Sequence, residues 1–352
     1  MWAPPSDYAS YIPRKVSNII VNHAATTIRN GATVQKAAIF GLKFAITAAC
    51  FWYVFHQIKL EELLRTADNL NFGWIAFATF ILMFQVPLAG WRWSKITNAL
   101  EPDGTMVPLG SMIAITAISV FLGQIVPNLM SEGIRVWLFS RIRRGWRRGI
   151  GSVLIDRGVG VGTLVAVGFV TLLFPSALTA LGGYRLLALF AFAGALAGGI
   201  AGLVFAPLYV PMLIRLRMTS WIGELIAASR LVLIGSGAAF SIVGIALGIH
   251  TLSIIGIWSL GRAFAMTLSV VDASLLFTLM VAIAILPISV GGWGLRELAV
   301  TTFLGAQGFP VQQAFLFSVT FGLILIAASL PGALIMIFYS PGQIQGNPAS
   351  PS

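Results

Sequence analysis

Two segments of this sequence place charged side chains beside a proline and small residues in otherwise apolar surroundings. The first contains Glu132 and Arg135, and the second contains Arg296 and Glu297. An ionisable side chain at membrane depth costs about 3 kcal/mol or more unless it is paired or wetted, so each one needs an account. Guanidinium groups bind phosphate through two parallel hydrogen bonds. These residues could therefore bind a lipid headgroup, or they could form buried salt bridges that fix the segments.

The spacing of these residues predicts which charges pair. Glu132 and Arg135 are three positions apart, so they share one face of a helix. Arg296 and Glu297 are adjacent in sequence and should not face each other on a helix. We therefore expect Arg296 to find its partner elsewhere, with Glu132 and Asp156 as candidates.

A further charged pair lies deep in another apolar segment. Asp156 and Arg157 are about six residues inside it, beyond easy snorkelling. Together with the two earlier segments they define a polar path through the protein. The candidate residues of this path are Glu132, Arg135, Asp156, Arg157, Arg296 and Glu297.

The sequence offers little support for catalysis. Glu132 or Asp156 could act as a general base, but no nucleophile or set of metal ligands accompanies them. The three histidines are far apart, and HExxH, GxSxG and P-loop motifs are absent. We expect no catalytic residues, no metal, no cofactor and no nucleic-acid partner.

The turns before these charges look like two copies of one unit. IVPNLMSEGIRVW begins at Ile125 and ILPISVGGWGLREL begins at Ile285. The separation of nearly half the chain favours an internal repeat. Glycines in the second turn permit a positive φ, so they fit either a tight re-entrant turn or a nest of backbone donors for phosphate. The expected turn residues are Pro127, Pro287, Gly291, Gly292 and Gly294.

Composition places these motifs in a membrane. Hydrophobic residues make up 58% of the 352 residues and charged residues only 9%, which excludes an ordinary soluble domain. Runs of about 20 apolar residues predict full membrane spans. The predicted spans are Ala37–Phe55, Phe72–Gly90, Gly149–Phe174, Arg185–Val210, Leu231–Thr267 and Gln312–Tyr339. We expect the fifth to be one long tilted helix, with a break near His250 as the alternative.

The distribution of arginine predicts how the chain crosses. Five arginines lie between Ser140 and Gly149, and basic loops favour the cytoplasmic side. With a cytoplasmic N-terminus, this loop is inside only if Leu109–Arg141 enters the membrane and returns. Ala273–Thr302 then becomes a matching hairpin from the opposite face, so the repeats are inverted.

The resulting prediction is an all-α polytopic membrane protein with about six full transmembrane helices and two re-entrant hairpins, eight hydrophobic segments in all. Residues 1–36 form a cytoplasmic segment, and 37–340 form one transmembrane domain. Its repeat halves span roughly 37–175 and 185–340, and 341–352 form a short tail.

Two further patterns predict packing. The small residues of AGALAGGIAG, from Ala193 to Gly202, are typical of close helix contacts. Trp91 and Trp93 beside Arg92 are typical of an aromatic belt at the membrane interface.

The two charged motifs together resemble a known family, the lysylphosphatidylglycerol synthase transmembrane region, which is the flippase-like domain of the multiple peptide resistance factor. The first motif contributes Pro127, Glu132, Gly133 and Arg135. The second contributes Pro287, Ser289, Gly291, Gly292, Gly294, Arg296 and Glu297, and Asp156–Arg157 resembles the acidic–arginine pair that follows in the family. Glu132 precedes Gly133 here, whereas the family more often has glycine first. The likeness covers about residues 40–340.

This resemblance implies a lipid translocator that moves a phospholipid or another lipid-linked substrate between leaflets of a bacterial inner membrane. The soluble aminoacyl-transfer domain of two-part relatives does not follow here, so we expect no lipid aminoacylation by this chain alone. A separate transferase is a possible partner. The alternative function is a membrane scaffold or accessory subunit for such an enzyme.

Overall fold

The computed structural model is built of helices joined by turns throughout the residues it describes, which are 52, 56, 60–101, 106–125, 128–142, 145–176, 182–285 and 293–338. The N-terminal segment 1–36, most of the predicted span Ala37–Phe55 and the tail 341–352 lie outside these residues. The prediction of an all-α membrane fold is confirmed for the part of the chain that is described.

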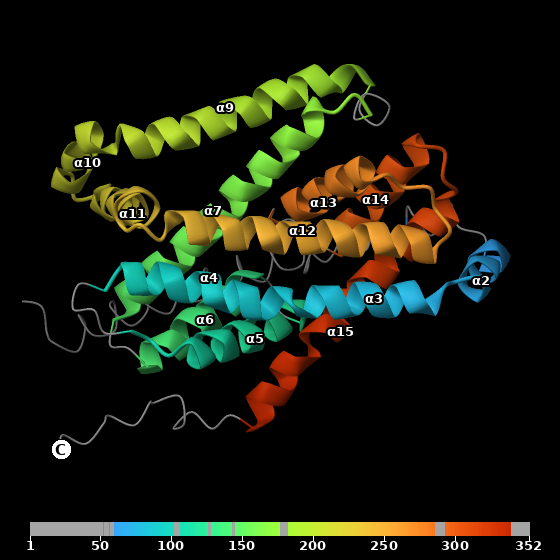
Figure 1. Cartoon of the computed structure of the whole chain (residues 1–352), viewed down its shortest axis with the longest axis horizontal. Helices are drawn as coiled ribbons and strands as arrows, with labels where there is room; N and C mark the ends of the chain where they lie inside the picture. The colour runs from blue at the N-terminus through green and yellow to red at the C-terminus, as the bar shows by residue number, and fades with distance from the viewer. Residues whose placement is uncertain are drawn as a thin grey trace, which may run out of the picture.

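The helices follow one another with short connections (Figure 1). In chain order they are α2 (Leu60–Asp68), α3 (Phe72–Met83), α4 (Gln85–Ala99), α5 (Leu109–Ile125), α6 (Asn128–Ile142), α7 (Trp146–Leu173), η2 (Gly182–Tyr184), α9 (Arg185–Val204), α10 (Ala206–Arg215), α11 (Ser220–Arg230), η3 (Leu231–Gly235), α12 (Ala239–Ala263), α13 (Val270–Ile285), α14 (Leu295–Ala306) and α15 (Val311–Phe338).

Five described helices are long and apolar enough to cross a bilayer. They are Phe72–Ala99, Trp146–Leu173, Gly182–Val204, Ala239–Ala263 and Val311–Phe338. Each corresponds to a predicted span, so the chain is a multi-pass membrane protein. The shorter apolar helices α5 and α13 fall where the two hairpins were predicted.

The first of these spans contains a break that proline explains. Proline has no N–H, and its ring clashes with the carbonyl one turn earlier. Pro87 therefore interrupts the helix near Phe84, whose own N–H bonds to Ile81 three residues back. The helix resumes as α4 and continues to Ala99, nine residues beyond the predicted end at Gly90.

The predicted long helix at 231–267 is wrong in its extent. The helix around His250 is continuous, so the alternative break there is also wrong. The interruption comes earlier, where Gly237 has a φ of +65° between the π-turn η3 and α12. Glycine tolerates this backbone conformation without strain, which explains why the chain breaks here.

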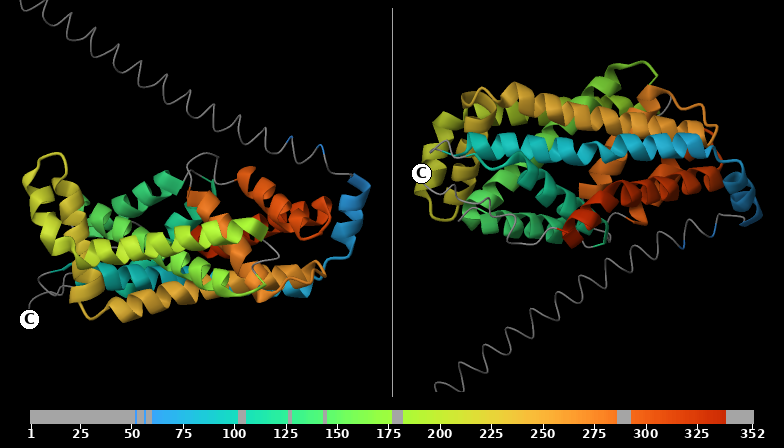
Figure 2. Two further views of the ribbon diagram at one scale, coloured as in Figure 1. Left: turned by 90° about the horizontal axis from the view of Figure 1, so that it is seen from above. Right: turned by 60° about the horizontal axis from the view of Figure 1, so that its bottom comes forward.

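Helices α3 and α4 run antiparallel to α12. The N–H of Asn71, just before α3, bonds to the carbonyl of Ala263 at the end of α12. Further along, the amide of Gln85 donates to Ser253. In Figure 1 and in the right view of Figure 2 these helices lie side by side along the long axis. The C-terminal ends of α4 and α12 are therefore at opposite ends of the bundle.

The helix pairs α5–α6 and α13–α14 consequently start from opposite ends of the bundle. Asn98 at the end of α4 accepts a bond from Val107 N, which anchors the start of α5 at that end. Met266 folds back onto Gly261 at the end of α12, which places the start of α13 at the other end. Figure 1 shows α5–α6 and α13–α14 entering from the two ends toward the middle.

The packing of the two halves is reciprocal. Helix α5 packs on α15, the long helix that follows α13–α14. Helix α13 packs on α7, the long helix that follows α5–α6. The α5–α15 contact is very close, because a Cβ at Gly332 would lie 2.1 Å from the carbonyl oxygen of Ala117. Small residues permit such backbone approach between membrane helices.

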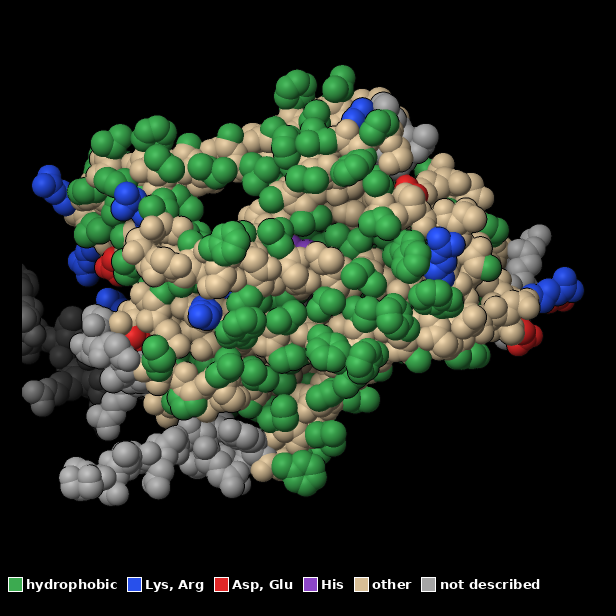
Figure 3. Space-filling model, in the orientation of Figure 1, with side chains coloured by type: hydrophobic (Ala, Val, Ile, Leu, Met, Phe, Trp, Pro, Cys, Tyr) green, Lys and Arg blue, Asp and Glu red, His purple; other side chains and the backbone are tan. Residues whose placement is uncertain are grey.

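Helix α9 stands away from this bundle. It packs on α7 near one end, where Phe192 contacts Gly168, and α10 and α11 return the chain to the bundle at the other end. Figure 3 shows an opening between α9 and the helices below it. A Cβ at Gly194, Gly198 or Gly199 would meet nothing within 4 Å, whereas one at Gly202 would lie 3.7 Å from the hydroxyl of Tyr209 on α10. Among the described residues, the predicted close packing of this small-residue stripe is therefore found only at Gly202.

Candidate functional site

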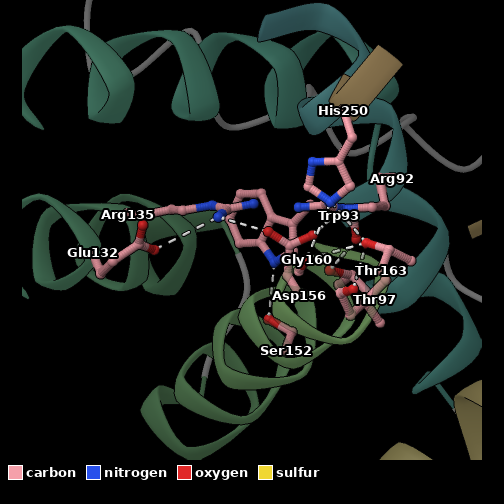
Figure 4. A network of polar contacts seen from close by, with 11 residues as sticks. Arg92, Trp93, Thr97, Glu132, Arg135, Ser152, Asp156, Gly160, Thr163 and His250 are labelled. Atoms are coloured by element: carbon pink, nitrogen blue, oxygen red, sulfur yellow. Dashed lines mark hydrogen bonds and ion pairs between the residues drawn. The ribbon is translucent and has the colours of Figure 1, made fainter. Parts of the chain in front are cut away.

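Five charged residues from three helices meet between α4, α6 and α7. Figure 4 labels Arg92, Glu132, Arg135 and Asp156 among them. Helix α6 begins at Asn128, so its first turns bring the charges of the first motif against α7. Helix α4 reaches the same place because it extends beyond Gly90. We call this group the charged cluster: Arg92, Glu132, Arg135, Asp156 and Arg157.

Asp156 is the centre of the charged cluster. One carboxylate oxygen accepts from Nε of Arg92 at 2.8 Å, and the other accepts from Nη1 of Arg135 at 3.0 Å. The side chain of Asp156 is only 3% exposed. A carboxylate buried in this way is stabilised by two cationic partners that share its charge. It ties α4, α6 and α7 together at one point.

Arg135 is held by an aromatic ring as well as by charge. Its guanidinium carbon lies 4.0 Å from the centre of the Trp93 ring, a cation–π contact. Trp93 is fully buried and donates its own N–H to Ser152 on α7. The Nε and Nη2 atoms of Arg135 are buried without a hydrogen-bond partner. These two atoms form the edge with which arginine binds phosphate or carboxylate through two bonds.

Glu132 connects the buried part of the charged cluster to its exposed rim. Its carboxylate accepts from Arg157 and lies 3.6 Å from Nη1 of Arg135, which confirms the predicted pairing of Glu132 with Arg135. The side chain of Arg157 is 56% exposed, whereas that of Arg135 is 6% exposed. The charged cluster therefore runs from the protein surface to the interior.

The charged cluster contains one more positive charge than negative charges. It contains three arginines and two carboxylates, which gives three minus two, or +1. Because the side chain of Arg157 is 56% exposed, the excess positive charge lies at the exposed rim, where it attracts an anion toward the charged cluster. One phosphate with a single negative charge would balance it.

A neutral polar extension leads from the charged cluster to α12. His250 lies 3.1 Å from the carbonyl oxygen of Gly160 and 2.9 Å from the hydroxyl of Thr163. A Cβ at Gly160 would lie 3.8 Å from the guanidinium of Arg92, so Arg92 packs along the same turn of α7. Figure 4 shows His250 and Arg92 on the same side of that turn.

The second motif forms a separate and neutral site. Arg296 donates to Oε1 of Glu297 from Nε at 3.0 Å and from Nη2 at 2.6 Å. Ser318 on α15 also donates to Glu297, which is fully buried. The prediction that Arg296 pairs with Glu132 or Asp156 is therefore wrong. Both residues lie in the first turn of α14, where long side chains can fold back alongside each other instead of continuing around the helix.

Gly294 explains why Glu297 folds back. It has a φ of +84° and caps the start of α14, and its N–H donates to Oε2 of Glu297 at 2.6 Å. The predicted positive φ is confirmed. The predicted free backbone donor for phosphate is wrong at Gly294, because Glu297 already occupies it. The other turn residues, Pro127, Pro287, Gly291 and Gly292, lie outside the described residues.

Sequence reasoning missed two members of the site, Arg92 and Trp93. Both were interpreted as part of an interfacial belt, but both are buried, and Trp91 alone of the three is exposed. One signal could have found Arg92. Asp156 has no basic residue three or four positions away in its own helix, so its partners had to come from other segments.

The fold and the charged cluster define a multi-pass helical membrane protein with an ion-pair network between its helices. The sequence model described as the lysylphosphatidylglycerol synthase TM region matches residues 40–332. This match covers most of the chain, so the protein belongs to that family. No curated protein and no solved structure matches it.

Proposed function

We propose that this protein translocates a lipid with an anionic phosphate headgroup between the leaflets of its membrane. The observation that carries the proposal is the free edge of Arg135. Two buried nitrogen atoms without partners, in a charged cluster of net charge +1, suit one phosphate group. Membership of a family named for a lipid-modifying synthase is in keeping with a lipid substrate.

The shape of the protein supports the passage of a lipid. A translocator must give the headgroup a polar route while the acyl chains stay in the bilayer. The charged cluster offers such a route from the exposed Arg157 to the buried Arg135. The opening beside α9 lies among apolar helices, and all of α9 is exposed or half-buried (Figure 3). It gives acyl chains lateral access to the bundle.

The reciprocal packing supports an inverted repeat. In our interpretation, α3 to α7 form one repeat unit and α12 to α15 form the other, with α5 equivalent to α13 and α7 equivalent to α15. The contact of α5 with α15 is then equivalent to the contact of α13 with α7. Units related in this way cross the membrane in opposite directions, as antiparallel α4 and α12 do. The pairs α5–α6 and α13–α14 are then opposed re-entrant hairpins.

The charges at the two ends of the bundle support the proposed orientation. Basic residues gather at the end where α4 finishes: Lys95, Arg141, Arg147, Arg148, Arg215, Arg217 and Arg230. Figure 3 shows a group of Lys and Arg side chains, in blue, at the end of the molecule where α4 finishes. By the positive-inside rule, this end faces the cytoplasm. The predicted span Ala37–Phe55 would then put the N-terminus on the same side.

We propose translocation in preference to catalysis. Each carboxylate of the charged cluster is ion-paired with arginine, which stabilises its charged form and makes it a weaker general base. A non-transporting scaffold for a separate transferase is the alternative function. The second site suits a structural role, because its charges are neutralised by each other.

The test is transfer of lipid in liposomes. Purified protein is reconstituted into phosphatidylcholine liposomes with a trace of phosphatidylglycerol that carries a fluorescent label on one acyl chain. Dithionite added outside bleaches only the outer leaflet, unless the protein brings inner lipids out. We expect bleaching to continue to the inner pool without ATP. Loss of signal equal to that of empty liposomes, with and without a proton gradient, would favour the scaffold.

A further inference from the structure

His250 is a buried titratable residue that the path for the headgroup does not use. It lies near the middle of the 25-residue helix α12 and is buried. This position is roughly 16 Å along the helix axis from the start of α12. An ionisable group at such depth is expensive to keep and is often part of a proton relay.

The hydrogen bonds of His250 assign its neutral tautomer. The carbonyl oxygen of Gly160 can only accept, so the Nε2 that faces it must carry the proton. The hydroxyl of Thr163 donates to Val159 O at 2.8 Å, so it too accepts from Nε2. Nδ1 is then the nitrogen without a hydrogen. It can accept a second proton without breaking the link between α12 and α7.

The charged groups around His250 come from two helices. Helix α4 supplies Arg92, which packs along the same turn of α7, and α7 supplies Asp156, which Arg92 binds. The sequences of α3, η3 and α15 contain no ionisable residue, and α13 contains only Asp272 in its first turn, bonded to Ser269. The only other ionisable residue of α12 is Arg262, about three helical turns from His250.

We propose that His250 is a proton-binding site and that the protein takes up one proton on Nδ1 together with the anionic headgroup. This inference rests on the proposed function for its anion. A proton on His250 puts a second cation beside Arg92, in a charged cluster that already carries a net +1. Proton uptake is therefore disfavoured while the site is empty. A phosphate at Arg135 removes this repulsion.

The two ligands must then assist each other equally. If an anion favours the protonated histidine, the protonated histidine favours the anion by the same factor. Coupling of this kind is typically about fivefold to 100-fold in affinity. The complex of one phosphate and one proton also has a smaller net charge to move across the bilayer than phosphate alone. A proton gradient would thus drive the lipid in the direction of proton flow.

Nuclear magnetic resonance of the histidine ring tests proton uptake directly. The protein, with His23→Gln and His56→Gln and with ¹⁵N-labelled histidine, is placed in phosphatidylcholine nanodiscs, so that every ring signal comes from His250. We expect the neutral Nε2–H tautomer in these discs at about pH 7. Discs containing phosphatidylglycerol should shift the ring toward the doubly protonated form at the same pH. A ring with the same charge in both kinds of disc would overturn the proposal.

The liposome assay tests the consequence for transport. The substitution His250→Gln keeps an amide donor for the carbonyl oxygen of Gly160 but removes the group that takes up a proton. We expect wild-type transfer of phosphatidylglycerol to rise at least fivefold as the pH falls from about 8 to about 6, and His250→Gln to remove this dependence. An identical pH dependence in the two proteins would refute the proton site. Absence of transfer in both proteins would refute the proposed function, while the ring signals would still decide whether His250 binds a proton.

Discussion

The guanidinium of Arg135 lies over the ring of Trp93, with 4.0 Å between its central carbon and the centre of the ring. Trp93 is itself fixed by a hydrogen bond to Ser152 on α7 and by contact with Phe139 on α6. The ring therefore restricts where the guanidinium of Arg135 can lie. Arginine is suited to this arrangement because its guanidinium is planar and always charged.

Removal of the central carboxylate should destabilise the protein. Asp156→Asn removes the carboxylate that Arg92 and Arg135 share and leaves Glu132, 3.6 Å from Arg135, as the nearest anion. Removing one partner of a buried ion pair costs about 3 to 5 kcal/mol. We expect a clear fall in the midpoint of thermal unfolding in detergent. Glu224→Gln on the exposed face of α11 is the matched control and should leave it unchanged. Equal midpoints for both variants would show that Asp156 does not hold the helices together.

The second site should be sensitive to a single methyl group. A Cβ at Gly322 would lie 2.5 Å from Nη2 of Arg296 and 2.8 Å from the Trp293 ring. Gly322→Ala must therefore displace Arg296 from Glu297, and we expect a loss of stability of about 1 to 3 kcal/mol. Gly158→Ala on α7 is the control, because its Cβ would meet nothing within 4 Å. Thermal unfolding of both variants checks this, and unchanged stability of Gly322→Ala would contradict the described packing.

Cysteine labelling should place the two hairpins on opposite sides. With Cys50 replaced by Ser, single cysteines at Ser140 and Ser220 should react with an impermeant maleimide only from the cytoplasmic side. One at Gln307, at the end of α14, should react only from the other side. These sites lie at opposite ends of the bundle. Labelling of Ser140 from the same side as Gln307 would rule out the re-entrant interpretation of α5–α6.

The sequence predicted the spans well because long apolar runs in a membrane have few alternatives. All five described spans fall on predicted ones, and α5 and α13 fall on the predicted hairpins. Apolar length is a local property, so it can be read without knowledge of neighbouring helices. The residues at which these spans begin and end were less predictable. Only the structure shows that Pro87 bends the first described span and does not end it.

The partners of the charged residues were less predictable, because they depend on contacts between helices. The Glu132–Arg135 pair was found from spacing within one helix, but the partnership of Asp156 with Arg92 joins residues 64 apart. Arg296 and Glu297 were misjudged because the first turn of a helix allows side chains to fold back toward the cap. The stripe of small residues on α9 was interpreted as close packing, but among its glycines only Gly202 has a neighbour within 4 Å in the described residues, the hydroxyl of Tyr209.

Arg135→Lys offers the most direct test of the central claim, that the free edge of Arg135 binds a lipid phosphate. Lysine keeps a positive charge for Asp156 but has neither the two-nitrogen edge nor the planar group that stacks on Trp93. The measurement is the initial rate of phosphatidylglycerol transfer in the dithionite assay, for protein that is reconstituted to the same density. Arg217→Ala, an exposed residue in the loop before α11, is the control.

We expect transfer by Arg135→Lys to fall at least tenfold, which corresponds to the loss of about 1.4 kcal/mol of binding to phosphate. Arg217→Ala should transfer lipid at the wild-type rate. Thermal unfolding of each variant separates a loss of binding from a loss of fold. A stable Arg135→Lys protein that transfers phosphatidylglycerol as fast as wild type would contradict the assignment of Arg135 as the phosphate ligand.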